Sequence, residues 1–273
     1  MKTIIRYLLV FLLLVIYSCD EDIETTPKKN LLIFCDLSSS LSSESVEAES
    51  KKIQAIIKNI PFNTKISVYP MGLSIYQNPL LTDSIKSETN SKLKNKVIDK
   101  KRKEIARVLD SIIINNYKTK NTEQETQFKS CIINSFEMAF NYLPDNDDKL
   151  LKNSRIIFLT DMIEQCPESS AGSIYMCSKT RQPNFEEIKK QIQEEYNPTS
   201  KLSDKIKTNQ LFIVMTSNYG NQQKCLTEIQ QNEIWDIVLQ KQGFVEDYAK
   251  IIRKSTEVPS TEILWKQEEN FND

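Results

Sequence analysis

The chain has 273 residues, and none of them is histidine. Without imidazole, the hydrolases that use Ser-His-Asp or Cys-His groups are excluded, and so are the common zinc sites with histidine ligands. Lysine or carboxylate chemistry is compatible with this composition, but the sequence contains no motif that indicates either. We therefore do not expect an enzyme.

The N-terminal segment has the pattern of a secretory signal. An apolar run of nine residues, Leu8 to Ile16, follows the basic residues Lys2 and Arg6. This run is too short to cross a hydrocarbon core of roughly 30 Å, which takes about 20 apolar residues, and it is typical of a cleaved signal. It ends in Ile16-Tyr17-Ser18-Cys19, which resembles a bacterial lipobox, in which the cysteine is acylated and becomes the mature N-terminus.

This resemblance predicts a signal peptide over residues 1–18 and a lipid-anchored Cys19, in the bacterial cell envelope on its extracytoplasmic side. The alternative is a plain cleaved signal or a short membrane anchor, in which Cys19 is incidental. Residues 20–30 are polar and without periodicity, so the stretch 19–30 is interpreted as a flexible tether between the lipid and the folded part.

The mature chain has no excess of positive charge. Removal of residues 1–18 takes two from the 36 basic residues, which leaves 34 basic and 37 acidic residues. This balance gives no electrostatic reason to expect a nucleic-acid partner. Basic residues do gather in Lys92–Arg107, which we interpret as the solvated face of a surface helix. The alternative is contact with anionic lipid headgroups beside the anchor.

Apolar runs alternate with helical periodicity along the rest of the chain. Strands are predicted at 31–35, 65–71, 155–160 and 211–215, and helices at 43–60, 84–117, 128–143, 184–196 and 228–240. Unbroken apolar strands indicate a parallel sheet that is covered on both faces. We predict one α/β domain over residues 31–273, with a doubly wound, mostly parallel sheet, helices on both faces and an insert near 162–183.

Six cysteines become five once Cys19 carries lipid, and five cannot all pair within one molecule. Disulfides persist in an oxidising compartment. Cys166 and Cys177 flank a short, turn-rich segment and are predicted to form a disulfide. Cys35, inside an apolar strand, and Cys131, on the apolar side of a helix, are expected to be buried thiols. Cys225 is not assigned a partner.

Two aspartates directly follow predicted strands, Asp36 after the first strand and Asp161 after 155–160. Ligand sites of parallel sheets lie beyond the carboxyl ends of the strands, so we expect both on one solvent-facing edge. Asp36, Ser38 and Ser40 alternate in a turn, which lets their oxygens converge. Oxygen ligands without nitrogen or thiolate favour a hard cation, Mg²⁺ or Mn²⁺.

The order of these residues resembles the von Willebrand factor A domain family and its metal-ion-dependent adhesion site. The family's Asp-x-Ser-x-Ser motif, later Thr and last Asp match, in order, Asp36, Ser38, Ser40, Thr126 and Asp161. The resemblance covers about residues 31–240. The family usually has Gly after the last Asp and near the Thr, whereas this chain has Met162 and Glu125 there, and only four glycines in all.

The resemblance implies that a partner's Asp or Glu completes the metal coordination. We therefore expect a lipid-anchored binding module that captures a protein or ligand through its metal. The alternative is a structural or assembly lipoprotein that uses the same scaffold without metal. An enzyme that transfers phosphate from an Asp nucleophile is disfavoured, because the haloacid-dehalogenase-like pattern has a second Asp where Ser38 stands.

Overall fold

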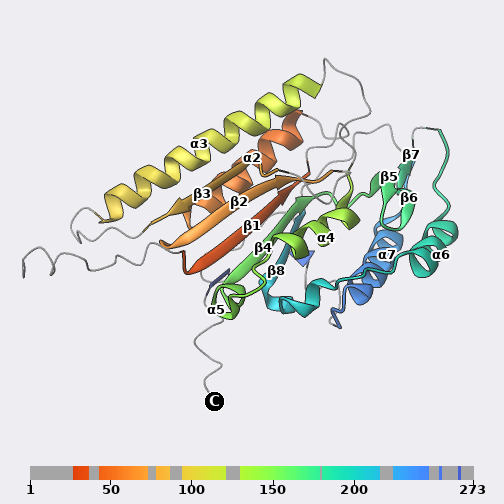
Figure 1. The fold of residues 1–273 in the computed structure, drawn as a ribbon. Coiled ribbons are helices and arrows are strands. Elements are labelled where there is room, and N and C mark those ends of the chain that lie inside the picture. Colours follow the sequence, from red (N-terminus) through yellow and green to blue (C-terminus); the bar gives the residue numbers. More distant parts are fainter. Residues whose placement is uncertain are drawn as a thin grey trace, which may run out of the picture.

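A central six-stranded sheet with helices on both faces organises the molecule (Figure 1). The computed structural model describes residues 27–36, 43–72, 78–86, 94–120, 130–178, 180–215, 224–245, 252–253 and 264–265. Within them, the predicted α/β fold with a doubly wound, mostly parallel sheet is confirmed.

The spatial order of the strands is β10, β8, β4, β1, β2 and β3. They span Lys29–Cys35 (β1), Thr64–Pro70 (β2), Leu81–Ile85 (β3), Ser154–Thr160 (β4), Leu211–Met215 (β8) and Ile252–Arg253 (β10). Neighbours pair in parallel, except that β3 is antiparallel to β2. After β1 the chain adds β2 and β3 on one side of β1, and then β4, β8 and β10 on the other side. The direction of winding therefore reverses between β1 and β4.

The described α-helices lie around this sheet, and the short helix α5 precedes β4. They span Ser43–Lys58 (α2), Lys94–Lys120 (α3), Ile132–Tyr142 (α4), Asp148–Lys152 (α5), Phe185–Glu195 (α6) and Glu228–Lys241 (α7). Helices α2 and α3 cover one face, α4 and α7 lie on the side of the other face, and α6 packs beside α7 and β6 (Figure 1). No helix in the described ranges is long and apolar enough to span a bilayer.

Strand β1 explains why the predicted strands are apolar without interruption. Leu31, Ile33 and Cys35 pack in the core on the α2 side, whereas Leu32 and Phe34 pack on the α4 side. Successive side chains of a strand point to opposite faces, so a strand between two helix layers needs apolar residues at every position. All five side chains are buried.

The predicted helix over 84–117 is wrong at its start. Residues Leu81–Ile85 form the edge strand β3, and α3 begins only at Lys94. An edge strand has a neighbour on one side only, and most side chains of β3 are partly exposed. Its sequence, LTDSI, therefore lacks the apolar run that identifies the central strands.

The segment expected as an insert near 162–183 forms two small sheets beyond the carboxyl end of β4. Strand β5 (Gln165–Ser169) pairs with β6 (Gly172–Tyr175), and β7 (Cys177–Ser178) pairs with β9 (Lys224–Cys225). Gly172 has a φ of 82°, a left-handed conformation that glycine adopts without steric penalty, and it closes the turn of the β5–β6 hairpin.

Two disulfides fasten these small sheets. One joins Cys131, at the start of α4, to Cys166 in β5, and the other joins Cys177 in β7 to Cys225 in β9. The predicted Cys166–Cys177 disulfide is wrong, and so is the expected thiol at Cys131. Cys166 and Cys177 lie on different sheets, and each faces a cysteine distant in sequence. The disulfides indicate an oxidising compartment.

Candidate functional site

Two of the predicted metal ligands come together where the winding of the sheet reverses. Asp36 directly follows β1 and Asp161 directly follows β4, and these strands are parallel neighbours. Open α/β sheets bind their ligands at such a reversal point. The expectation of a solvent-facing edge is wrong, however, since Asp36 and Asp161 are 0% and 6% exposed.

Asp36 is held by hydroxyl groups from two other segments. Its Oδ2 accepts hydrogen bonds from Ser130 Oγ and from Thr160 Oγ1, the latter at 3.1 Å. The backbone amide of Asp36 donates to the carbonyl of Leu159 at 2.9 Å. A buried carboxylate needs such donors in place of water. Asp36 is therefore part of a polar network inside the fold.

Asp161 lies close enough to Asp36 for their charges to interact. Burial raises the pKa of the Asp161 carboxyl well above its usual range, and the negative charge of Asp36 raises it further. The hydrogen bond from the amide of Ile163 to Asp161 Oδ1, at 3.0 Å, acts in the opposite direction. A positive charge placed between the two carboxylates would offset both the burial and the repulsion.

A third acid, Glu164, belongs to the same site and was not predicted from the sequence. It is fully buried, and its Oε2 accepts hydrogen bonds from the amides of Ile132 and Ile133, at 2.7 and 3.1 Å. Its Oε1 has no hydrogen-bond partner within the described part of the chain. The one available signal was an acid directly after the apolar pair Met162-Ile163, just beyond a buried strand.

The pKa of Glu164 is raised to about 8, chiefly by burial and also by the charge of Asp36. The two amides of α4 lower it, because they donate to the charged form. Glu164 thus caps α4 from a neighbouring segment, since the N-cap residue, Cys131, makes no side-chain cap. The capping carboxyl is mostly protonated at neutral pH.

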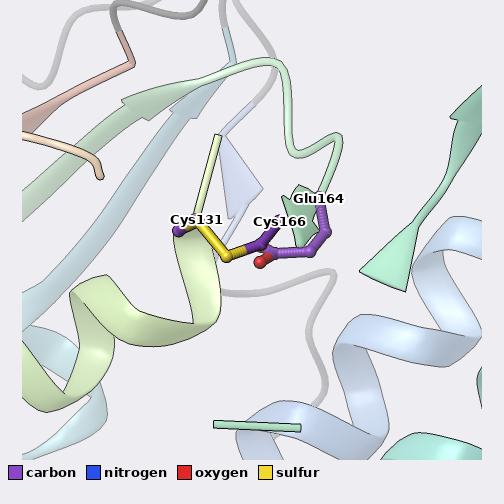
Figure 2. Close-up of side chains that lie close together, drawn as sticks. All are labelled: Cys131, Glu164 and Cys166. Atoms are coloured by element: carbon purple, nitrogen blue, oxygen red, sulfur yellow. A yellow bond between two sulfur atoms is a disulfide. The ribbon is translucent and has the colours of Figure 1, made fainter. Parts of the chain in front are cut away.

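The Cys131–Cys166 disulfide holds Glu164 against α4 (Figure 2). The amide of Gln165 also donates to the carbonyl of Ser130 at 2.9 Å, which binds the same two segments together. The two sulfurs and a carboxylate oxygen of Glu164 lie within 4.8 Å of one another, a spacing that suits a metal ion. The metal ligand is the thiolate, however, and both sulfurs are in a disulfide, so this group is not a metal site.

Met162 adopts the backbone conformation that glycine favours. Its φ is 59°, and it stands where the resembled family has Gly. Its amide donates to Thr160 Oγ1 at 3.0 Å, and its carbonyl accepts from Trp235 Nε1 at 2.9 Å. A non-glycine residue in this region is strained by roughly 1–2 kcal/mol. Met162 therefore adopts a left-handed conformation although it has a side chain.

Four further predicted residues lie outside the described ranges: Cys19, Ser38, Ser40 and Thr126. The signal peptide and residues 19–26 of the tether lie outside them too, so these remain predictions. The predicted end of the tether at residue 30 is wrong, because Lys29 and Asn30 belong to β1. Ser130, four residues after Thr126, is one of two hydroxyl residues that the structure describes beside Asp36, the other being Thr160.

A cavity of about 610 Å³ lies apart from these acids, between the β5–β6 hairpin, β7 and α6. Tyr175, Arg181 and Glu187 are among its lining residues. Some polar groups of its wall are used within the fold, as where the Nε2 of Gln182 and that of Gln191 each donate to a carbonyl at 2.7 Å. None of the acids at the winding reversal lines this cavity.

Comparison with protein-family models gives no match for this chain, and comparison with curated proteins gives none either. The von Willebrand factor A resemblance therefore rests on the motif residues alone.

Proposed function

We propose that this protein is a lipid-anchored binding module of the bacterial cell envelope that captures a protein partner through a divalent cation, Mg²⁺ or Mn²⁺. The observation that carries the proposal is the meeting of Asp36 and Asp161 where the sheet reverses its winding. The two side chains described as donors to Asp36, Ser130 and Thr160, are both hydroxyls, so the described groups around the two aspartates are oxygens. Oxygen-only sites favour hard cations.

In this proposal Asp36 and Asp161 supply the negative charge that holds the cation. Ser38, Ser40 and Thr126 ligate it directly or through water, as the family resemblance implies. An Asp or Glu of the partner completes the coordination, so cation and partner bind together. Mg²⁺ suits such a site because it retains several exchangeable ligands besides one or two carboxylates.

The lipid anchor is supported by the lipobox-like Ile16-Tyr17-Ser18-Cys19. The two disulfides support the extracytoplasmic location, because they indicate an oxidising compartment. Replacement of Cys19 by Ala should release the protein from the membrane fraction or block its maturation. Each acyl CH₂ that leaves the bilayer costs about 0.8 kcal/mol, so the loss should be large. Equal membrane retention of the variant would contradict the anchor.

The cation is tested by calorimetric titration with Mg²⁺ and with Mn²⁺, followed by thermal melts. Asp36→Asn keeps the size and one acceptor oxygen of the side chain but removes its charge. It should lower the affinity for the metal by more than about tenfold, because even residues that only hydrogen-bond to a metal ligand typically contribute about tenfold or more. Asp148→Asn, an exposed aspartate in α5, is the control. The absence of any heat or melting shift with wild type at millimolar metal would refute the proposal.

The alternative is a structural or assembly lipoprotein that needs no metal. The observation in its favour is that Ser130, Thr160 and Ile163 already donate to the two aspartates. In that case Asp36→Asn lowers the melting temperature with or without metal, and the metal ions themselves leave wild type unchanged.

A further inference from the structure

Charge is unevenly distributed between α3 and the rest of the protein. Helix α3 contains nine basic and three acidic residues, a net charge of +6, in a chain whose total is −1. The other residues together therefore carry −7. The cation site described above makes no use of this helix.

Four basic residues of α3 form a straight row on its outer surface, here called the basic stripe: Lys96, Lys100, Lys103 and Arg107. Their spacing of four, three and four residues keeps them within a sector of about 60° around the axis, over a length of about 16 Å. All four are exposed. The opposite side of the helix packs in the core with Ile98, Ile105, Leu109 and Ile113.

The acidic residues of α3 do not neutralise this stripe. Asp99 is 3.0 Å from Arg102, and Glu104 is 3.7 Å from Lys101, which points to β3. Asp110 accepts a hydrogen bond from α2. None of the four stripe side chains forms an ion pair with a carboxylate in the described ranges. The stripe is therefore available to an external anion.

We propose that the basic stripe binds the anionic phospholipid headgroups of a membrane. Helix α3 runs along one side of the molecule, over α2 and β3, so its outer surface can lie flat on a planar partner (Figure 1). Val97 and Val108, 39% and 37% exposed, flank the stripe on one shoulder, and apolar residues beside basic ones are typical of helices at a bilayer interface. The disulfides argue against a nucleic acid, since they indicate an oxidising compartment.

Contact through α3 orients the domain. The opposite face of the sheet, with α6 and α7, then turns away from the membrane (Figure 1). This inference does not depend on the cation site, and it concerns a contact additional to any lipid anchor.

The first experiment compares vesicles of phosphatidylcholine with vesicles that also contain phosphatidylglycerol, using the full chain. The ratio of the two affinities cancels the contribution of the N-terminal apolar segment. Lys100→Gln/Lys103→Gln should lower this ratio about thirtyfold, because each basic residue near an anionic surface contributes about fivefold. The matched control is Lys149→Gln/Lys190→Gln, which removes two exposed lysines from α5 and α6.

The second experiment needs no variant. Acetylation of lysines in wild type, read by mass spectrometry, should be slowed at Lys96, Lys100 and Lys103 by the anionic vesicles. Protection should disappear at about 1 M salt, where the screening length is about 3 Å.

In the first experiment, equal effects of the stripe and control variants on the affinity ratio would overturn the proposal. Protection by soluble polyphosphate but not by vesicles would overturn it as well, in favour of a soluble polyanion.

Discussion

Replacement of Glu164 by Gln should make the protein less sensitive to alkaline pH. Glu164 has a pKa of about 8 in the folded protein, against a usual value of 4.5, so the folded state retains a proton that the unfolded state releases. Its contribution to stability is complete below pH 4.5 and is lost as pH rises through 8. The loss is about 1.4 kcal/mol per pH unit, or roughly 4–5 kcal/mol over the window.

Gln has nearly the same shape and carries no charge at any pH in this window. Its amide oxygen can accept the two α4 amide hydrogen bonds that Glu164 Oε2 accepts. The variant and wild type should therefore be similar in stability near pH 5. As pH rises toward 8, wild type should lose stability that the variant keeps, so the difference in favour of the variant should grow. Asp161 also has a raised pKa, but it is present in both proteins and largely cancels in the difference.

Urea denaturation at intervals from pH 5 to 8 measures this difference. Glu168→Gln, an exposed glutamate in β5, controls for the general effect of removing a negative charge. If the stability of Glu164→Gln and wild type falls in parallel over this range, Glu164 does not hold its proton and the account of its burial is wrong. A difference of the opposite sign would show that the α4 amides, and not burial, control its ionisation.

Two further predictions concern the covalent and backbone framework. Non-reducing peptide mapping should find Cys131 linked to Cys166 and Cys177 linked to Cys225. The bonds close loops of 35 and 48 residues, so each stabilises the protein by about 4 kcal/mol in the chain-entropy model. Peptides in any other pairing would contradict the structure. Met162→Gly should be more stable than Met162→Ala by about 1 kcal/mol in thermal melts. Both variants lose the buried side chain, but only Gly is unstrained at a φ of 59°. If the Ala variant is as stable as the Gly variant or more stable, residue 162 is not in the left-handed conformation.

The central strands could be predicted because their buried position requires a recognisable hydrophobic pattern in the sequence. Strands β1, β4 and β8 lie between two helix layers, so they appear as uninterrupted apolar runs, and their bounds were correct within two residues. Strand β3 has no such mark, because an edge strand with partly exposed side chains tolerates polar residues. The strand was therefore missed, and its last two residues, Ser84 and Ile85, were assigned to the helix that follows.

The candidate site was predictable in part for a similar reason. Parallel neighbouring strands end at the same edge of a sheet, so acids that directly follow β1 and β4 had to meet, and Asp36 and Asp161 do. Glu164 and Ser130 belong to the same site only because the start of α4 lies against the segment after β4. No local sequence pattern predicts that contact, because the two segments are distant in sequence.

The sequence by itself determined the layered α/β architecture and the meeting of two aspartates, since both follow from local patterns and from the rule that parallel strands share an edge. Only the tertiary structure decided which cysteines pair, that the aspartates are buried, and that a third acid caps α4. Disulfide pairing, burial and the raised pKa of Glu164 depend on which segments lie together in space. Those contacts arise from the packing of helices on the sheet, over sequence separations of 30 residues and more.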